Sequence, residues 1–228
     1  LIEAPEAGWA STQTLGLFAA GIVGLAAFIG WERRTPEPML DVNIFRNLRF
    51  SAASLSVTVA FFALAGFIFL ITQYFQFLKG YGPLETGFRL LPVATSVAIS
   101  SIVGTQLAVR YGTKFIVGGG LVTLSVAYGW VSTSGVDTSY LEIACQMIFL
   151  GTGMGLTSAP ATESIMGAVS NAKAGIGSAV NDTTRELGGA LGVAVLGSLV
   201  ASRYGTRLEP ALGLLPDDLS DRARESLA

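Results

Sequence analysis

The sequence contains no histidine and only one cysteine, Cys145. Histidine is the side chain that most often acts as an acid or base near neutral pH, and it is also the commonest metal ligand. A single cysteine excludes a disulfide within the chain and a CxxC metal or redox pair. We therefore expect no metal site and no cofactor. Cys145 lies in an apolar stretch, and we interpret it as a small buried hydrophobe.

Common catalytic motifs are also missing. The sequence has no GxSxG pattern, no HExxH pattern and no GxxxxGK[ST] phosphate-binding loop. These patterns mark hydrolase nucleophiles, zinc proteases and ATP sites respectively. The sequence therefore gives no support to a membrane enzyme, and this chain supplies no ATP site.

Charged residues are scarce. They make up 13% of the chain, whereas hydrophobic residues make up 51%. An ordinary soluble domain carries about a quarter charged residues, so this chain has too little charge to cover a soluble surface. The net charge is −2 and no basic cluster is present, which argues against nucleic acid as a partner.

Long apolar runs take the place of the missing charge. A hydrocarbon core of about 30 Å needs about 20 apolar helical residues. The runs are continuously apolar and have no polar face, which disfavours soluble helices, and they lack the alternation of a transmembrane β-barrel. Five charge-free runs of the required order are present, at residues 8–31, 50–78, 90–109, 115–136 and 143–162.

A sixth run, at residues 187–202, is too short to span unless its helix begins earlier. Extending it back toward Ala174 takes Asp182, Arg185 and Glu186 into the membrane. With that extension the sequence predicts an all-α integral membrane protein with six transmembrane helices.

Lysine and arginine are unequally shared between the two sets of connecting loops. One set carries two, Lys79 and Arg89, and the other carries seven. Cytoplasmic loops are enriched in these residues, so the bias predicts that the larger set lies inside the cell and that both ends of the chain lie outside. The seven are Arg33, Arg34, Arg46, Arg49, Arg110, Lys114 and Lys173.

Two segments outside the spans need an interpretation. Residues 36–47 mix apolar and charged side chains, which suits either a short segment along the inner interface or a plain linker. The chain opens at Leu1 on a polar stretch without the features of a signal peptide, and it ends on another polar stretch. We interpret it as a piece of a longer polypeptide, with a complete small membrane protein as the alternative.

The charged cluster of the sixth span is a candidate site. Asp182, Arg185 and Glu186 are three and four residues apart, so they can meet on one helix surface. A lone charge at the bilayer centre costs at least about 2.5–3.5 kcal/mol, so such groups are functional candidates. In a structural interpretation, Arg185 neutralises the acids or contacts a neighbouring helix. In a functional interpretation, a carboxylate carries a proton or binds a substrate cation, although a nearby cation favours the ionised carboxylate.

Other polar residues are candidates with weaker signals. Glu163 lies near the inner end of the fifth span, where it suits an anchor or cap as well as a coupling site. Gln73 and Gln76 are amides in an apolar helix, and such amides face a bundle interior or a wet cavity. For four phenylalanines the sequence does not decide between a position facing a cavity and one facing the lipid: Phe61, Phe62, Phe67 and Phe75.

Glycine and proline predict how the helices pack and bend. Gly188 and Gly192 are four residues apart and form a small-residue face that lets another helix approach closely, and Gly151 and Gly155 do the same in the fifth span. Pro160 removes one backbone hydrogen bond from that span. We regard Pro160 as a hinge candidate as well as a packing residue.

Three motifs carry a family resemblance. Residues 74–92 contain the pattern Y-x-Q, G-Y-x-P-L-x-x-G, L-L-P, residues 151–160 contain GTGMG followed by AP, and residues 177–194 read GSAVNDTTRELGGALGVA. These motifs resemble the major facilitator superfamily, in its 14-span drug/proton antiporter branch. Together with Gly8-Trp9 and the segment 31–38, the resemblance covers nearly the whole chain.

The resemblance implies a domain organisation. Residues 1–49 would be an outer loop, a linker transmembrane helix and an inner amphipathic loop. Residues 50–203 would be five helices of the C-terminal transporter bundle, and residues 204–228 would be an outer loop before a missing last helix. The implied partners are the lipid bilayer, a small-molecule substrate, protons and the missing N-terminal bundle.

The resemblance also implies a function, which is proton-coupled efflux of drugs or small organic molecules from a bacterial plasma membrane. By itself, the incomplete chain would be inactive. Uptake of a metabolite and a non-transporting membrane module remain alternatives.

One motif departs from the family pattern. The loop motif of the superfamily recurs at residues 105–114, but Val109 stands where the motif has aspartate. Without that aspartate the usual charge relay at a gate cannot form. Arg110 and Lys114 are then interpreted as positive-inside anchors.

Overall fold

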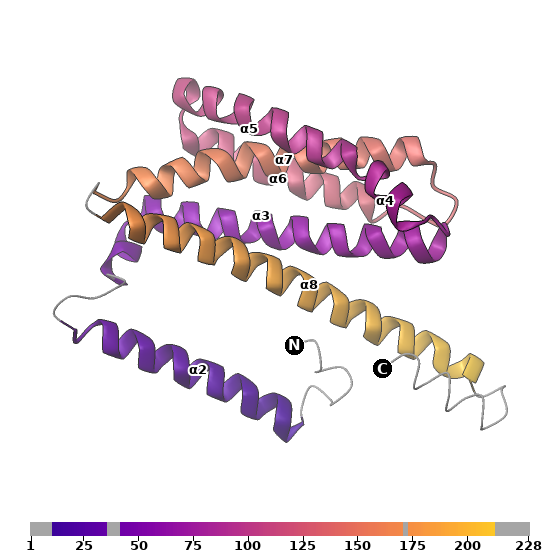
Figure 1. Ribbon diagram of the computed structural model, residues 1–228, viewed down its shortest axis with the longest axis horizontal. Helices are drawn as coiled ribbons and strands as arrows, with labels where there is room; N and C mark the ends of the chain where they lie inside the picture. The colour runs from indigo at the N-terminus through magenta and orange to yellow at the C-terminus, as the bar shows by residue number, and fades with distance from the viewer. Residues whose placement is uncertain (1–10, 36–41, 171–172, 213–228) are drawn as a thin grey trace. The chain divides into compact units, whose positions relative to one another are not determined.

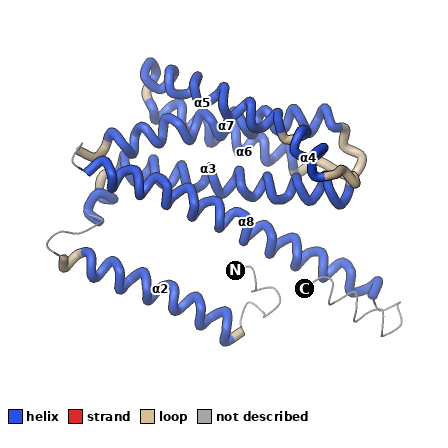
Figure 2. The backbone as a smooth tube through the Cα atoms, viewed as in Figure 1, coloured by secondary structure: helices blue, strands red, loops and turns tan. Residues whose placement is uncertain are grey.

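The protein is described by a computed structural model over residues 11–35, 42–170 and 173–212. These residues are helical and include no strand (Figure 2), so the predicted all-α membrane fold is confirmed. The chain divides into two compact units, Met39–Gly192 and the combination of Leu1–Pro38 with Val193–Ala228. Each unit is described by itself.

The larger unit contains most of the helices. They are α3 (Leu48–Gln73), α4 (Pro83–Arg89), α5 (Leu91–Tyr111), α6 (Thr113–Val131), α7 (Tyr140–Gly167) and the first half of α8 (Ala174–Leu212) (Figure 1). A short 3-10 helix, η1 (Val42–Arg46), precedes α3, and a π-helical turn, η2 (Tyr74–Leu78), extends it. The smaller unit contains α2 (Thr12–Glu32) and the second half of α8.

Five of these helices are long and apolar enough to cross a membrane. They are α2, α3 with η2, α4 with α5, α6, and α8 from Ala174 to Arg203. The fifth predicted span, residues 143–162, is the remaining one and corresponds to α7, which has 28 residues. Its glycine, serine and threonine residues lower its mean hydropathy, and half of its residues are buried against other helices.

α8 begins at Ala174, the residue to which the sixth span was extended, and it runs unbroken past Asp182, Arg185 and Glu186. It continues to Leu212, so the backbone of residues 204–212, which the sequence predicts to be loop, is helical. This stretch contains Gly205 and Pro210, which disfavour a helix, so intrinsic propensity does not explain the continuation. The outer-loop predictions for residues 1–10 and 213–228 lie outside the described residues.

The segment between α2 and α3 is described in part. Residues 36–41 lie outside the described residues, and the described remainder forms η1, whose side chains are exposed or half-buried. This short helix is compatible both with a segment at the inner interface and with a linker.

α7 is the central helix of the larger unit, and it packs against α5, α6 and α3 (Figure 1). Its glycines lie at these contacts. Gly151 and Gly155 face α5, where the hydroxyl of Ser100 lies 3.1 Å from the carbonyl oxygen of Gly151. Gly153 faces Gly120 of α6. A side chain at any of these four glycines would collide with the neighbouring helix, so the close approach depends on glycine.

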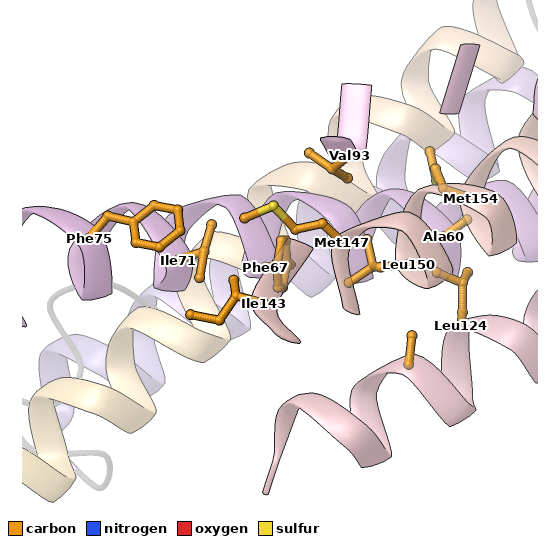
Figure 3. Close-up of a cluster of buried hydrophobic side chains, with 11 residues drawn as sticks. Ala60, Phe67, Ile71, Phe75, Val93, Leu124, Ile143, Met147, Leu150 and Met154 are labelled. Atoms are coloured by element: carbon orange, nitrogen blue, oxygen red, sulfur yellow. The ribbon is translucent and has the colours of Figure 1, made fainter. Parts of the chain in front are cut away.

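The main hydrophobic cluster lies between α3 with η2 and α7, as Figure 3 shows. Phe67 and Phe75 are 2% and 1% exposed; Phe67 lies beside Met147 and Leu150 of α7, and the Phe75 ring lies 6.4 Å from the ring of Tyr140. The sequence did not decide whether these two phenylalanines face a cavity or the lipid. The structure shows that they are core residues. Phe62 is half-buried.

The two cations on the predicted outer side hold the connections at that end together. The Lys79 ammonium donates a hydrogen bond to the carbonyl oxygen of Val136 at 2.6 Å. The Arg89 guanidinium lies over the rings of Tyr81 and Tyr140, 4.0 and 4.8 Å from their centroids. Such cation–aromatic contacts are favourable. Together these contacts tie the segment after α3 to the start of α7.

We predict that Gly155→Ala destabilises the full-length protein. A Cβ at this position would lie 2.7 Å from both the Ser101 amide nitrogen and the Val97 carbonyl oxygen, and backbone atoms cannot rotate away. Overpacking of this kind costs about 1–3 kcal/mol. Thermal unfolding in detergent micelles should show a lower Tm. Gly119→Ala is the matched control, because a Cβ there meets nothing within 4 Å. Equal Tm values for the two variants would contradict the prediction.

Candidate functional site

A hydrogen-bonded bridge joins α7 to the first half of α8. The Arg185 guanidinium donates from Nη2 to the hydroxyl of Thr162 at 3.1 Å, and that hydroxyl donates to Oδ1 of Asn181 at 3.0 Å. Asn181 is 5% exposed. Thr162 thus acts as donor and acceptor at once, which satisfies buried polar atoms on both helices.

Helix geometry explains how α8 presents this bridge. Asn181 and Arg185 are four residues apart and therefore lie on one face of α8. Gly188 and Gly192 lie against α3, where a Cβ would collide with the carbonyl oxygens of Thr58 and Phe62 respectively. The small-residue stretch lets α8 approach α3, while the polar stretch before it binds α7.

The predicted charged cluster lines a cavity of about 390 Å³ beside this bridge. Asp182 and Glu186 are exposed, and Arg185 is half-buried. The Arg185 guanidinium lies 5.2 Å from the centroid of the Phe61 ring of α3. Phe61, whose environment the sequence did not decide, therefore lines a cavity together with the three charged residues and Gly189.

Arg185 does not neutralise the two acids directly. Among the described residues it forms no ion pair with Asp182 or Glu186, and its hydrogen bond goes to Thr162 instead. Its Nε atom is buried without a partner. The guanidinium keeps its charge at all accessible pH values, so it supplies a fixed positive charge. The two carboxylates are open to water, a proton or a cationic ligand.

Glu163 and the two glutamines lie apart from this cavity. Glu163 follows Thr162 but is exposed and does not line the cavity. Gln73 is the last residue of α3 and Gln76 lies in η2, and both are half-buried. The structure therefore does not bring these three candidates together with Asp182. A cavity role for the glutamines stays a prediction.

Pro160 is buried within α7, which runs as one helix from Tyr140 to Gly167. It lies two residues before Thr162. The hydroxyl of Thr157 donates to the carbonyl oxygen of Gly153 at 2.8 Å, so it does not serve the carbonyl freed by the proline, which is that of Leu156. The hinge role of Pro160 stays a prediction.

Sequence reasoning missed two residues of the bridge, Thr162 and Asn181. Thr162 was treated only as the end of an apolar run. A signal was present for Asn181, because an amide four residues before an arginine shares its helix face. No sequence signal indicated that the partner of both residues would be a threonine on α7.

Comparisons with known proteins give the family context. Residues 6–193 match the family model described as Major Facilitator Superfamily. The chain is 34% identical over 212 residues to "Multidrug resistance protein Stp" of Mycobacterium tuberculosis, which covers 93% of this chain and 39% of that protein. It is 30% identical over 217 residues to "Multidrug efflux pump LfrA" of Mycolicibacterium smegmatis, covering 95% of this chain and 43% of that protein.

A third relative is the "Tetracenomycin C resistance and export protein" of Streptomyces glaucescens. It is 32% identical over 206 residues, which cover 90% of this chain and 38% of the relative. The chain thus spans about two fifths of the length of the curated relatives it matches.

We predict that Thr162→Val weakens the contact between α7 and α8. Valine keeps the shape of threonine but removes both hydrogen bonds of the bridge. At about 0.6 kcal/mol for an average hydrogen bond between membrane helices, the loss is about 1 kcal/mol. Thermal unfolding of the full-length protein in detergent measures it. Thr183→Val is the control, because the exposed Thr183 hydroxyl bonds only within α8. A Tm for Thr162→Val at or above that of the control would exclude a stabilising bridge.

Proposed function

Because the chain belongs to the major facilitator superfamily, we propose that it forms part of a secondary transporter that exports small organic molecules. Its apolar helices and its bacterial relatives make it a multi-pass protein of a bacterial cell membrane. The names of several relatives refer to multidrug resistance, efflux or export, which favours export over uptake of a metabolite.

The proposal concerns the full-length polypeptide. We assign α2 as a linker helix of the 14-span branch, and α3, α5, α6, α7 and α8 as helices of its C-terminal bundle. In transporters of this kind, two bundles rock about a central substrate site. The segments of the longer relatives that have no counterpart here would supply the other bundle, and we expect the isolated chain to transport nothing.

The observation that carries the mechanism is the separation of roles in the charged cluster. Arg185 is held by Thr162 and Phe61, whereas Asp182 and Glu186 are exposed in the cavity and form no ion pair with any described residue. We propose that one of these carboxylates takes up a proton in the outward-open state and releases it in the inward-open state. Arg185 keeps α8 bound to α7 throughout, because its charge does not change.

The same cavity supports a second role for the carboxylates. Phe61 presents an aromatic ring beside two acids, and acids with an aromatic face suit an organic cation. A cationic drug would then compete with the proton for one carboxylate. Such competition couples the two movements, because a carboxylate that holds a proton cannot also neutralise the drug.

We predict that Asp182→Asn or Glu186→Gln, whichever carboxylate carries the proton, abolishes export driven by a pH gradient. The measurement uses the full-length transporter in proteoliposomes with an imposed pH gradient and a fluorescent drug. Expression should stay normal, because both side chains are exposed and neither makes an ion pair. Exchange of drug across the membrane without a gradient should persist if the residue only carries the proton.

Asp137→Asn is the matched control. It makes the same chemical change at an exposed acid in the connection between α6 and α7, so export should equal that of the unmodified protein. If both cluster variants export the drug as fast as the unmodified protein does, neither carboxylate couples export to the proton. Loss of drug exchange together with gradient-driven export would assign the carboxylate to drug binding instead.

We also predict that Pro160→Ala slows transport at least severalfold without changing substrate affinity. Alanine restores the backbone N–H that proline lacks, so α7 would favour a straighter helix. The measurement is the transport rate as a function of drug concentration. An unchanged maximal rate would remove the hinge role and leave Pro160 as a packing residue.

A further inference from the structure

A second cavity lies among α3, α5, α6 and α7. Its volume is about 780 Å³, and it is formed where the N-terminal ends of α3 and α6 meet the C-terminal ends of α5 and α7. Sites for organic ligands in proteins commonly have volumes of about 300–1,000 Å³. The cavity is distinct from the one lined by Asp182 and Glu186, with which it shares no lining residue.

Among the residues that the structure describes, two cations line this cavity and no acid does. Arg49 comes from the first turn of α3, and Lys114 comes from the first turn of α6. The Nε of Arg49 contacts the hydroxyl of Ser164 at 3.5 Å, which keeps the side chain over the cavity. The lining residues include no aspartate or glutamate, so the positive charge is not neutralised within the cavity.

Backbone amides add to this positive character. α6 has 19 residues and begins after Gly112, which has no side chain to cap it. Among the described residues, the amides of Thr113 and Lys114 have no hydrogen-bond partner. Unpaired amides at a helix N-terminus attract anions, phosphate groups in particular. Two cations and two amides therefore converge on the same end of the cavity.

The rest of the lining is apolar. Ala52, Val117, Gly118 and Leu121 form the wall away from the cations, and Phe115 stands at the rim with 74% of its surface exposed. A small soluble anion would leave this wall without a contact. An amphiphile with an anionic head and a hydrocarbon tail would use both parts.

We propose that this cavity binds an anionic glycerophospholipid of the inner leaflet. Its phosphate would lie between Arg49, Lys114 and the N-terminus of α6, and one acyl chain would lie along the apolar wall. The bias of lysine and arginine puts this end on the cytoplasmic side, where anionic lipids are attracted to basic residues. Basic pockets between transmembrane helices on that side bind anionic head groups in other membrane proteins.

The proposal explains a departure seen in the sequence. Val109 stands where the family loop motif has aspartate. Lys114, near the end of that motif, then has no motif carboxylate to pair with, and the lipid phosphate supplies the missing negative charge. In this interpretation Lys114 is a ligand-binding residue as well as a topological anchor.

Native mass spectrometry of the full-length protein, with dioleoylphosphatidylglycerol as the probe, tests the proposal. Titration should show a saturable bound lipid, whereas dioleoylphosphatidylcholine and inorganic phosphate should neither bind with comparable affinity nor displace it. The double variant Arg49→Gln/Lys114→Gln should weaken binding on the order of 30-fold, because two cations near the head group are removed. Transport is not the readout, so the result is independent of the export proposal.

Two further variants keep the test decisive. Arg46→Gln/Arg110→Gln removes the same charge from exposed residues at the same end that do not line the cavity, and it should leave binding nearly unchanged. Gly118→Leu keeps both cations but fills the apolar wall, where a Cβ meets nothing within 4 Å. It should weaken binding at least fivefold while the protein stays folded.

Three outcomes would overturn the proposal. Equal losses in the two double variants would mean that the lipid responds only to overall surface charge. Displacement of the lipid by inorganic phosphate would mean a phosphate site without a lipid role. Unchanged binding in Gly118→Leu would mean that the lipid lies elsewhere, as it would if another segment of the full-length protein covers this cavity.

Discussion

The larger unit depends on the close approach of α7 to its neighbours. In a bilayer, helices gain little from the hydrophobic effect by packing together, so backbone proximity and van der Waals contact decide their association. α7 meets this requirement with Gly151 and Gly155 against α5 and with Gly153 against α6. The position of Thr162, two turns beyond Gly155, follows from that placement. The same placement of α7 brings Thr162 within hydrogen-bond distance of Asn181 and Arg185 on α8.

Composition and span length were sufficient to predict the helices, because a bilayer leaves few alternatives for a chain with so little charge. α7 was among the predicted spans, and its small residues also indicated close packing. The extension of α8 to Leu212 was missed because charge marks the end of a membrane core and not the end of a helix.

The candidate site was predictable in its membership but not in its connections. The spacing of Asp182, Arg185 and Glu186 placed them on one helix surface, and the structure gives them one cavity. Spacing could not show that Arg185 would bond to Thr162, 23 residues earlier in the chain. Likewise, nothing in the sequence distinguished Phe61 in the cavity from Phe67 in the core. Such choices depend on which helices become neighbours, and a single sequence carries no record of that.

The burial of α7 has a consequence for how proteins of this architecture diversify. Half of the residues of this helix are buried, and Gly151, Gly153 and Gly155 have no room for another side chain. A larger side chain at these three glycines would therefore collide with α5 or α6. α8 is different, because Asp182 and Glu186 are exposed on the helix while Gly188 and Gly192 hold it in place. In the proposed export function, a change of specificity would therefore come from substitution on the exposed face of α8, while the scaffold around α7 stays as it is.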